Sequence, residues 1–328
     1  MTGNRRVLVT GGAGFIGSHV ADRFLRDGWS VEIIDDLSSG KRENVPAGAT
    51  LHACDVRSAE AAALVADRDW RVIVHLAAQM DVRRSVADPM NDAQINIVGS
   101  LNLLEALRTR AADRRGRFVF ASTGGAVYGD LMPPPNPESR PKNPESPYAV
   151  SKLAVEHYLA YYTRVHGFET ASVRFANVYG PRQDAHGEAG VVAIFSGRLL
   201  DDEPLRVFGD GEQTRDYVFV GDVADATFRA ATHSLPASGD VDARAFNVGT
   251  GVATSVLELA RALGRAAGRE ARIEFAPQRP GEQRHSWLVI DKAASALGWT
   301  PRVALAQGLR ETFAWFAARR ESPARALL

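Results

Sequence analysis

Short apolar runs and longer amphipathic stretches alternate along the first 180 residues. Runs rich in valine and isoleucine occupy 5–11, 30–36, 50–56, 71–78, 117–123 and 170–180. Between them, apolar residues recur at helical spacing over 15–28, 58–68, 94–110 and 147–165. Alternating strands and helices are typical of a parallel sheet with helices on both faces. We therefore predict an α/β protein with a doubly wound parallel sheet of the Rossmann type.

The rhythm of the chain changes near residue 180. Beyond it the loops lengthen and the helix and strand signals become shorter and mixed, which predicts a smaller α/β lobe. We place the first domain at 1–179 and the second lobe at 180–328, with returns to the first domain near 216–250. The segment 130–146 is a proline-rich loop, and the tail 318–328 is expected to fray.

Composition narrows the class of protein. Hydrophobic residues make up 45% and charged residues 24% of the 328, as in ordinary globular proteins. The 39 basic and 39 acidic side chains balance, which argues against nucleic acid or a membrane surface as a partner. Cys54 is the only cysteine, so no intramolecular disulfide can form, and no apolar run suits a signal peptide or a membrane span. We expect a soluble, cytoplasmic protein.

Glycines are concentrated where the first strand turns into the first helix. The segment VTGGAGFIG (9–17) contains Gly11, Gly14 and Gly17 at intervals of three. Glycines at such a turn let the backbone approach a pyrophosphate, and the free amides of the helix start face that anion. A dinucleotide is therefore the expected ligand.

Acidic residues end the next two strands. Asp35 and Asp36 close the second strand, where a carboxylate accepts hydrogen bonds from the adenosine ribose and repels a 2′-phosphate. NAD is therefore expected rather than NADP. Asp55 closes the third strand, and the sequence leaves two interpretations open: a contact to adenine, or the cap of the helix at 58–68.

A tyrosine and a lysine lie one turn apart at the start of the helix 147–165. Ser146 is a good N-cap, and Pro147 a good first residue, so Tyr148 and Lys152 should share a face. The lysine ammonium and the positive nicotinamide ring of NAD⁺ both favour the phenolate. We expect the pKa of the tyrosine to fall from about 10 toward neutrality, which makes it a usable general base.

The same helix has apolar residues on most sides. Val155 and Leu159 extend the side that holds Tyr148 and Lys152, whereas the other side carries Val150, Leu153, Ala154 and Tyr158. A helix that is apolar on most sides needs cover on most sides. The second lobe or another subunit could supply it, and we expect a homodimer through this helix.

Five motifs together resemble one family. TGGAGFIG, HLAA, STGGAVYG, YAVSK and RFANVYGPR look like the extended short-chain dehydrogenase/reductase family, and most like its UDP-sugar 4-epimerases. The motifs span most of the chain in the family's order. The resemblance implies NAD as cofactor, bound by Gly11, Gly14, Phe15, Ile16, Gly17, Asp35, Asp36, Ser39, Gly40, Asp55, Val56, Leu76, Ala77, Ala78, Gln79, Asn96, Tyr148 and Lys152.

The resemblance also implies a chemistry. Tyr148 takes the proton of a sugar hydroxyl while C4 gives hydride to NAD⁺, and Lys152 holds the cofactor ribose. A serine or threonine hydroxyl usually assists, but Gly124 occupies its position here. Two adjacent glycines could let the loop shift, so Thr123 is our third catalytic candidate, with Ser122 in reserve.

The two residues after Gly124, where the family has its serine or threonine, also limit which reactions are possible. Related dehydratases place Asp-Glu there, and related decarboxylases keep a glutamate where Ala126 stands. Gly125 and Ala126 carry no proton-transfer group. The resemblance therefore implies 4-epimerisation through a transient 4-keto sugar, interconverting UDP-glucose and UDP-galactose.

The second lobe should hold the UDP-sugar. The resemblance implies substrate contacts from Thr123, Asn177, Val191, Val192, Phe208, Arg215, Arg279, Glu282 and Ser286. Arginine heads suit a diphosphate because they are planar and carry several donors. Without the resemblance, Phe208 would be assigned to the core and the two arginines to the surface. The small Ser286 leaves room for an N-acetyl group, so UDP-GlcNAc and UDP-GalNAc are further expected substrates.

Other functions remain open at this point. Another nucleotide-sugar epimerase, acting on UDP-glucuronate or a deoxysugar, would carry the same motifs, and so would a reductase. A non-catalytic NAD-binding module is the alternative from another class. The eight histidines have no metal-ligand spacing, so no metal site is predicted, and His75 at a strand end is expected to be a packed neutral residue.

Overall fold

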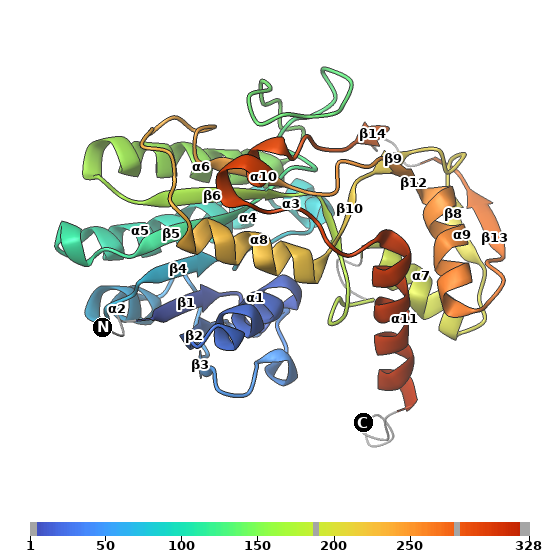
Figure 1. Ribbon diagram of the computed structural model, residues 1–328, viewed down its shortest axis with the longest axis horizontal. Helices are drawn as coiled ribbons and strands as arrows, with labels where there is room; N and C mark the ends of the chain where they lie inside the picture. Colours follow the sequence, from blue (N-terminus) through green and yellow to red (C-terminus); the bar gives the residue numbers. More distant parts are fainter. Residues whose placement is uncertain (1–4, 186–189, 279–282, 322–328) are drawn as a thin grey trace.

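The computed structural model describes residues 5–185, 190–278 and 283–321, and its larger lobe is built on one parallel sheet (Figure 1). All pairings in this sheet are parallel, in the order β11-β6-β5-β4-β1-β2-β3. Its strands are β1 (Arg6–Thr10), β2 (Ser30–Ile34), β3 (Thr50–His52), β4 (Val72–His75), β5 (Arg117–Thr123), β6 (Thr170–Phe175) and β11 (Ala245–Val248). The predicted doubly wound Rossmann-type sheet is confirmed.

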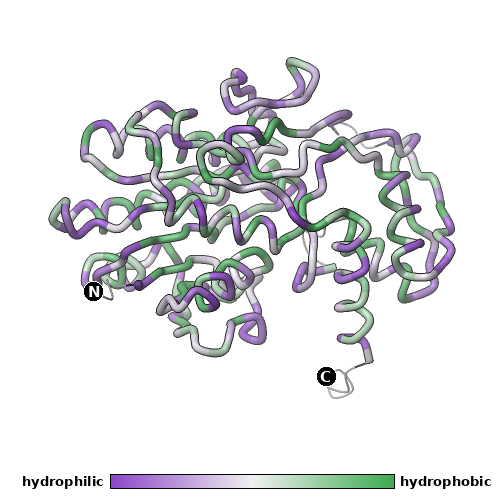
Figure 2. Tube along the Cα trace, viewed as in Figure 1, coloured by the Kyte–Doolittle hydropathy of each residue, from purple (hydrophilic) through white to green (hydrophobic). Residues whose placement is uncertain are grey.

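Helices cover both faces of the sheet because successive side chains point to opposite sides. On β1, Val7 and Val9 face one layer of helices, and Leu8 faces the other. The first layer contains α1 (Phe15–Arg26), α8 (Val220–Thr232) and α10 (Asp291–Leu297). The second contains α2 (Ala59–Asp67), α5 (Gly99–Arg108) and α6 (Pro147–His166). Along the outer helices, hydrophobic and hydrophilic residues alternate (Figure 2).

The connection from β4 to α5 differs from the prediction. The helix expected at 94–110 begins as a π-helical segment, η2 (Gln94–Val98), before α5. The short helices α3 (Val82–Ala87) and α4 (Pro89–Ala93) precede it and were not predicted. All three pack on α6. A π-helical turn widens the backbone and is frequent at functional sites.

Several strands are shorter than predicted. The strands expected at 30–36 and 50–56 end at Ile34 and His52, and 170–180 divides at Ala176 into β6 and β7 (Asn177–Tyr179). Because β7 pairs with β10 (Tyr217–Phe219), it leaves the main sheet toward the smaller lobe. The short 3₁₀ turns η1 (Arg42–Asn44) and η3 (Ala112–Arg114) lie in loops.

The smaller lobe has more regular helices than its sequence predicted. Its helices α7 (Val191–Leu200), α9 (Val256–Ala267) and α11 (Leu305–Glu321) enclose a separate core. A capping box of Ser255 and Glu258 begins α9. The expected fraying from Ala318 is wrong as far as Glu321, where α11 ends; residues 322–328 lie outside the described residues. Its short strands are β8 (Leu205–Phe208), β9 (Thr214–Arg215), β12 (Thr254–Ser255), β13 (Ile273–Ala276) and β14 (His285–Ser286).

Later parts of the chain contact the larger lobe. The strand β11 pairs with β6, α8 packs on α1, and α10 packs against β11 and α8. We therefore keep the division at residue 179 as a proposal, with returns at 216–250 and a further one at Asp291–Leu297. Within the described ranges, no helix combines the length and apolar character needed to cross a bilayer.

Candidate active site

The glycine-rich turn is held in a shape that side chains would prevent. Gly11 has φ 70°, and a Cβ built on it would lie 2.7 Å from the backbone nitrogen of Ala77. A Cβ on Gly17 would lie 2.0 Å from the carbonyl oxygen of Gly11. Gly14 begins α1 without a side-chain cap, and no acid lies in the first turn. The amides of Phe15 and Ile16 therefore begin a helix suited to an anion, as a pyrophosphate requires.

The acid at the end of β2 is buried beside that turn. Asp35 is 6% exposed, and its two carboxylate oxygens accept the amides of Ala13 and Leu37, each at 2.9 Å. Each oxygen keeps a second lone pair for a ribose hydroxyl. Burial raises the pKa of Asp35, and the two amide hydrogen bonds oppose that shift.

The neighbouring loop completes this part of the pocket. A Cβ on Gly40 would lie 2.5 Å from Oδ1 of Asp35, so the Ser39–Gly40 backbone passes close over the acid. Asp36 is turned toward the loop and accepts the amide of Ser38 at 2.9 Å. These residues fit a dinucleotide with an unphosphorylated ribose.

Asp55 does not cap α2. The N-cap of α2 is Ser58, whose hydroxyl accepts the amide of Ala61 at 3.1 Å. Asp55 instead forms a two-pronged contact with the guanidinium of Arg57, which lowers the pKa of that carboxyl. The interpretation of Asp55 as a helix cap is therefore wrong, and the adenine contact stays a prediction, as does that of the adjacent Val56.

The wall formed by Leu76, Ala77, Ala78 and Gln79 follows β4 and is tied to the rest of the pocket by hydrogen bonds. The amide of Ala77 donates to the hydroxyl of Thr10 at 3.2 Å. The amide of Gln79 donates to Oδ1 of Asn96, and Nδ2 of Asn96 donates back to the carbonyl of Gln79, both at 2.9 Å. The structure thus brings these predicted cofactor residues together at the carboxyl end of β4.

Tyr148 and Lys152 lie on the predicted helix. Ser146 caps α6 by accepting the amide of Ala149 at 3.2 Å, as expected. The ammonium of Lys152 lies 5.8 Å from the ring centre of Tyr148 and donates to the carbonyl of Ala121 at 2.9 Å. Since Ala121 is near the carboxyl end of β5, the pair faces the same sheet edge as the glycine turn.

The lysine is unusually buried for a cation. It is 3% exposed, and burial lowers its pKa to about 8, with Asp92 and Glu156 acting in the opposite direction. His75 lies nearby at 1% exposure, and burial lowers its pKa to about 3, so the imidazole is neutral, as predicted. Lys152 is therefore a buried cation beside Tyr148, with its charge only partly compensated.

The hydroxyl candidates differ in their surroundings. A Cβ on Gly124 would lie 2.6 Å from Leu288 and 3.0 Å from the carbonyl of Arg174, so this position cannot hold a side chain without rearrangement. Ser122 is 3% exposed, whereas Thr123 is half-buried. A Cβ on Gly125 would lie 3.9 Å from the hydroxyl oxygen of Thr123 and 3.8 Å from Oδ1 of Asn177. Thr123 and Asn177 therefore border the same space.

The substrate candidates of the smaller lobe fall into separate groups. Arg215 on β9 is paired in register with Ser286 on β14. Phe208 lines a small hollow with Gly209, Gln213, Gln278 and Arg284. Val191 and Val192 open α7, where Val192 is buried in the core. The predictions for Arg279 and Glu282 lie outside the described residues.

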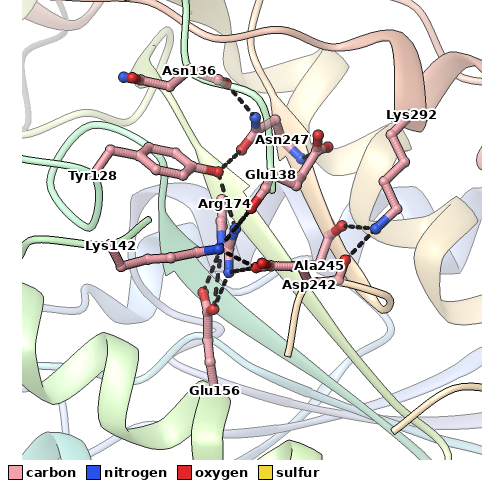
Figure 3. A network of polar contacts seen from close by, with 10 residues as sticks. All are labelled: Tyr128, Asn136, Glu138, Lys142, Glu156, Arg174, Asp242, Ala245, Asn247 and Lys292. Atoms are coloured by element: carbon pink, nitrogen blue, oxygen red, sulfur yellow. Dashed lines mark hydrogen bonds and ion pairs between the residues drawn. The ribbon is translucent and has the colours of Figure 1, made fainter. Parts of the chain in front are cut away.

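Sequence reasoning missed the buried charges behind the catalytic helix. Asp92 on α4 is 0% exposed and accepts the hydroxyl of Ser151, the residue before Lys152, at 2.6 Å. On the next turn, Glu156 binds the fully buried Arg174 of β6 (Figure 3). The serine and the glutamate on the buried side of α6 were the available signals.

A dinucleotide turn and a tyrosine–lysine pair at one sheet edge define a class, the nicotinamide-dependent enzymes of the short-chain dehydrogenase/reductase type. Residues 7–249 match the NAD dependent epimerase/dehydratase family. The chain therefore belongs to this family, which confirms the resemblance seen in the sequence and NAD as the cofactor.

Individual proteins are similar over nearly the whole chain. A UDP-glucose 4-epimerase from Mycolicibacterium smegmatis is 47% identical, covering 95% of this chain and 98% of that protein. The crystal structure of UDP-glucose 4-epimerase with UDP-glucose from Thermotoga maritima is 42% identical, with TM-score 0.89, covering 96% and 100%. That of the Thermus thermophilus UDP-glucose 4-epimerase complex with NAD is 44% identical, with TM-score 0.86, covering 95% and 99%.

Proposed function

We propose that this protein is a UDP-hexose 4-epimerase that interconverts UDP-glucose and UDP-galactose in the cytoplasm, as part of galactose metabolism. The observation that carries the proposal is the position of Lys152, which lies beside the ring of Tyr148 and donates to Ala121 at the sheet edge where the dinucleotide turn lies. The similarity to UDP-glucose 4-epimerases over nearly the whole chain supports the substrate.

The mechanism assigns a separate task to each residue of the pair. When bound, NAD supplies the hydride acceptor and donor for C4 of the sugar. Tyr148 removes the proton of the 4-hydroxyl and returns a proton after the keto sugar has turned over. Lys152 stabilises the phenolate by its charge and binds the cofactor ribose. The pocket formed by the glycine turn, Asp35 and the wall after β4 keeps the dinucleotide in place between the two half-reactions.

The experiment that tests this proposal is replacement of Tyr148 by phenylalanine. Loss of a positioned general base should lower kcat by roughly 10²–10⁴-fold. The fold and the bound NAD, measured by release on denaturation, should be unchanged. Turnover that persists undiminished in Tyr148→Phe would refute the mechanism.

Cofactor use separates the alternatives. An epimerase should purify with NAD and convert UDP-galactose without added cofactor, whereas a reductase should consume NADH or NADPH in proportion to product. A panel containing UDP-glucuronate and deoxysugar nucleotides distinguishes the other epimerases. A non-catalytic module would bind NAD and convert no member of the panel.

Thr123 is proposed as the assisting hydroxyl. Its half-buried position beside Asn177 supports it over the fully buried Ser122. Thr123→Val keeps the shape and removes the hydroxyl, and should lower kcat by roughly 10- to 100-fold if one hydrogen bond to a charged oxygen is lost. Ser122→Ala is the matched control and should leave kcat near that of the unmodified enzyme.

The proposed sugar pocket includes Ser286. Its small side chain supports acceptance of UDP-GlcNAc and UDP-GalNAc beside the hexoses, with Arg215 on the neighbouring strand as a diphosphate contact. Ser286→Tyr should abolish the N-acetyl activity and spare UDP-galactose. Absence of N-acetyl activity before the substitution, with no change after it, would contradict this proposal.

A homodimer through α6 is also proposed. The exposed large apolar residues of α6 are Val150, Tyr158, Tyr161 and Val165, and those of the helices packed on it are Val82, Val86, Met90 and Val98. A second copy that covers this surface would bury it from water. Light scattering should give a mass of two chains for the unmodified protein and of one chain for Tyr158→Glu. A mass of one chain for the unmodified protein would contradict the proposal.

A further inference from the structure

Asp92 is a buried carboxylate to which the proposed reaction gives no task. Its Oδ2 accepts Nε2 of Gln79 and Nδ2 of Asn96, both at 3.0 Å, and its Oδ1 accepts the hydroxyl of Ser151 at 2.6 Å. All these donors are neutral, and among the described residues the charge of Asp92 acts on Lys152 at longer range than an ion pair. A buried carboxylate with neutral donors alone keeps its charge available to a nearby cation.

The negative charge of Asp92 interacts electrostatically with the ammonium of Lys152. The charged or titratable groups that face its ammonium are Asp92 from α4, Glu156 and Tyr148 from α6 itself, and His75 from β4. β5 contributes the carbonyl of Ala121 and the ring of Phe120, whose centre lies 4.7 Å from the ammonium. His75 is neutral, and Glu156 is already bound by Arg174 of β6, which lies beyond it. Asp92 is therefore the carboxylate whose charge is not matched elsewhere.

A continuous chain of hydrogen bonds also joins Asp92 to the cofactor turn. The hydroxyl of Thr10 contacts Nδ1 of His75 at 2.6 Å, and Nε2 of His75 contacts the hydroxyl of Ser100 at 2.9 Å. That hydroxyl donates to the carbonyl of Asn96 at 2.6 Å, and the side chain of Asn96 donates to Asp92. The π-helical segment η2 carries Asn96 into this position.

We propose that Asp92 is a positioning residue of the reaction, which holds Ser151 and the charged form of Lys152 against Gln79 of the wall after β4 and Asn96 of η2. The proposal rests on the roles given above to Tyr148 and Lys152. Asp92 touches neither reacting group, so it acts through the lysine. Removing its negative charge should let Lys152 lose its proton at lower pH, and with it the stabilisation of the Tyr148 phenolate.

The test compares Asp92→Asn with two matched variants. In Asp92→Asn the alkaline limb of the pH profile of kcat should move to lower pH by about one unit, as expected for loss of one nearby opposite charge. Ser151→Ala removes one hydrogen bond to Asp92 and keeps the charge, so kcat should fall while the limb stays in place. Asp88→Asn replaces an exposed acid four residues earlier, at the N-cap of α4, and should change neither.

The outcomes are distinguishable. An alkaline limb that does not move in Asp92→Asn, with Tyr148→Phe inactive, overturns the positioning role and leaves the proposed function intact. Full activity of Tyr148→Phe overturns the proposed function itself. If Asp92→Asn does not fold, as judged by circular dichroism and bound NAD, Asp92→Ser removes the same charge with a smaller side chain. The same shift is then expected of it, and an unmoved limb overturns the proposal.

Discussion

Two buried carboxylates lie beside the catalytic helix, and their partners are of opposite kinds. Asp92, at the end that carries Ser151 and Lys152, is held by amides and a hydroxyl. Glu156, one turn beyond Lys152, is held by the guanidinium of Arg174 at 2.5–3.2 Å. In the first region the negative charge is held by neutral groups and acts on the active lysine, whereas in the second it is paired with the guanidinium of Arg174. The first arrangement adjusts the charge state of Lys152, and the second stabilises the fold. We call Arg174 and its partners the fastening region.

The fastening region joins four parts of the chain around Arg174 (Figure 3). Besides Glu156, the guanidinium contacts the hydroxyl of Tyr128 at 3.0 Å, the carbonyl of Glu138 at 3.2 Å and Asp242 at 2.9 Å. These contacts hold the proline-rich loop and the segment before β11 against β6 and α6. The surrounding negative charges raise the pKa of Arg174 in spite of burial, so it stays charged.

The largest expected effect on stability follows from removing only the cation of the Arg174–Glu156 pair. Arg174→Met leaves Glu156 buried without its cation, which should lower the free energy of unfolding by about 3–5 kcal/mol. The double variant Arg174→Met/Glu156→Met replaces both charges with apolar groups and should recover most of that loss. Urea unfolding followed by circular dichroism measures both, with the exposed Arg83→Met as control.

Equal losses in the single and double variants would contradict this. The stability would then come from the other contacts of Arg174 rather than from its pairing with Glu156. Activity per folded molecule should remain, since no group of this pair touches a reacting atom. A specific loss of kcat in the folded double variant would mean that the two regions are not separate.

A smaller effect is expected at Tyr128, on the edge of the fastening region. Its hydroxyl donates to Oδ1 of Asn247 at 2.8 Å and accepts from Arg174, and burial raises its pKa, so it stays protonated. Tyr128→Phe leaves a buried acceptor unsatisfied and should cost about 1–3 kcal/mol of unfolding free energy. Tyr161→Phe, on the exposed side of α6, is the matched control, and an equal loss there would contradict the assignment.

The sequence predicted the parts of the site that follow local rules. The glycine turn, the acids that follow β2 and the cap of α6 each depend on a few neighbouring residues, so their pattern was sufficient. The parallel, doubly wound character of the sheet also followed from the alternation of strands and helices, whereas the separation of β7 from β6 was missed because the partner of β7 lies about 40 residues away in β10. Backbone pairing over such distances has no local signal.

The two carboxylates show why the rest could not be predicted. Asp92 precedes the helix expected at 94–110 and looks like a surface acid in sequence. Only the short helices α3 and α4, with the π-helical η2, turn it toward Ser151. Glu156 is a polar residue on a mostly apolar helix, and its partner Arg174 is on a strand where every other residue is buried as well. Burial of charge is set by tertiary packing, which overrides local pattern.

The smallest expected effect is on the pH dependence of the unfolding free energy, which should distinguish the partly compensated Lys152 from the fully paired Arg174. Burial lowers the pKa of Lys152 to about 8 in the folded protein, against about 10.4 in an unfolded chain. Between these values the unfolded chain binds more protons, so stability should rise with pH by at most about 1.4 kcal/mol per unit. Below pH 8 both states are protonated, and this contribution has no slope. Activity should fall over the same range, because the ammonium is lost.

Lys152→Met isolates this contribution. The difference in unfolding free energy between the unmodified protein and Lys152→Met should grow in favour of the unmodified protein from about pH 8 to about pH 9.5, within the range that the two pKa values bound. Tyrosines with raised pKa values, such as Tyr128, act in the opposite direction at higher pH and cancel in the difference. A difference that is flat or declines with pH would show that the charge of Lys152 is compensated as fully as that of Arg174. Asp92 and Glu156 would then differ in the geometry of their contacts and not in how far they compensate a nearby cation.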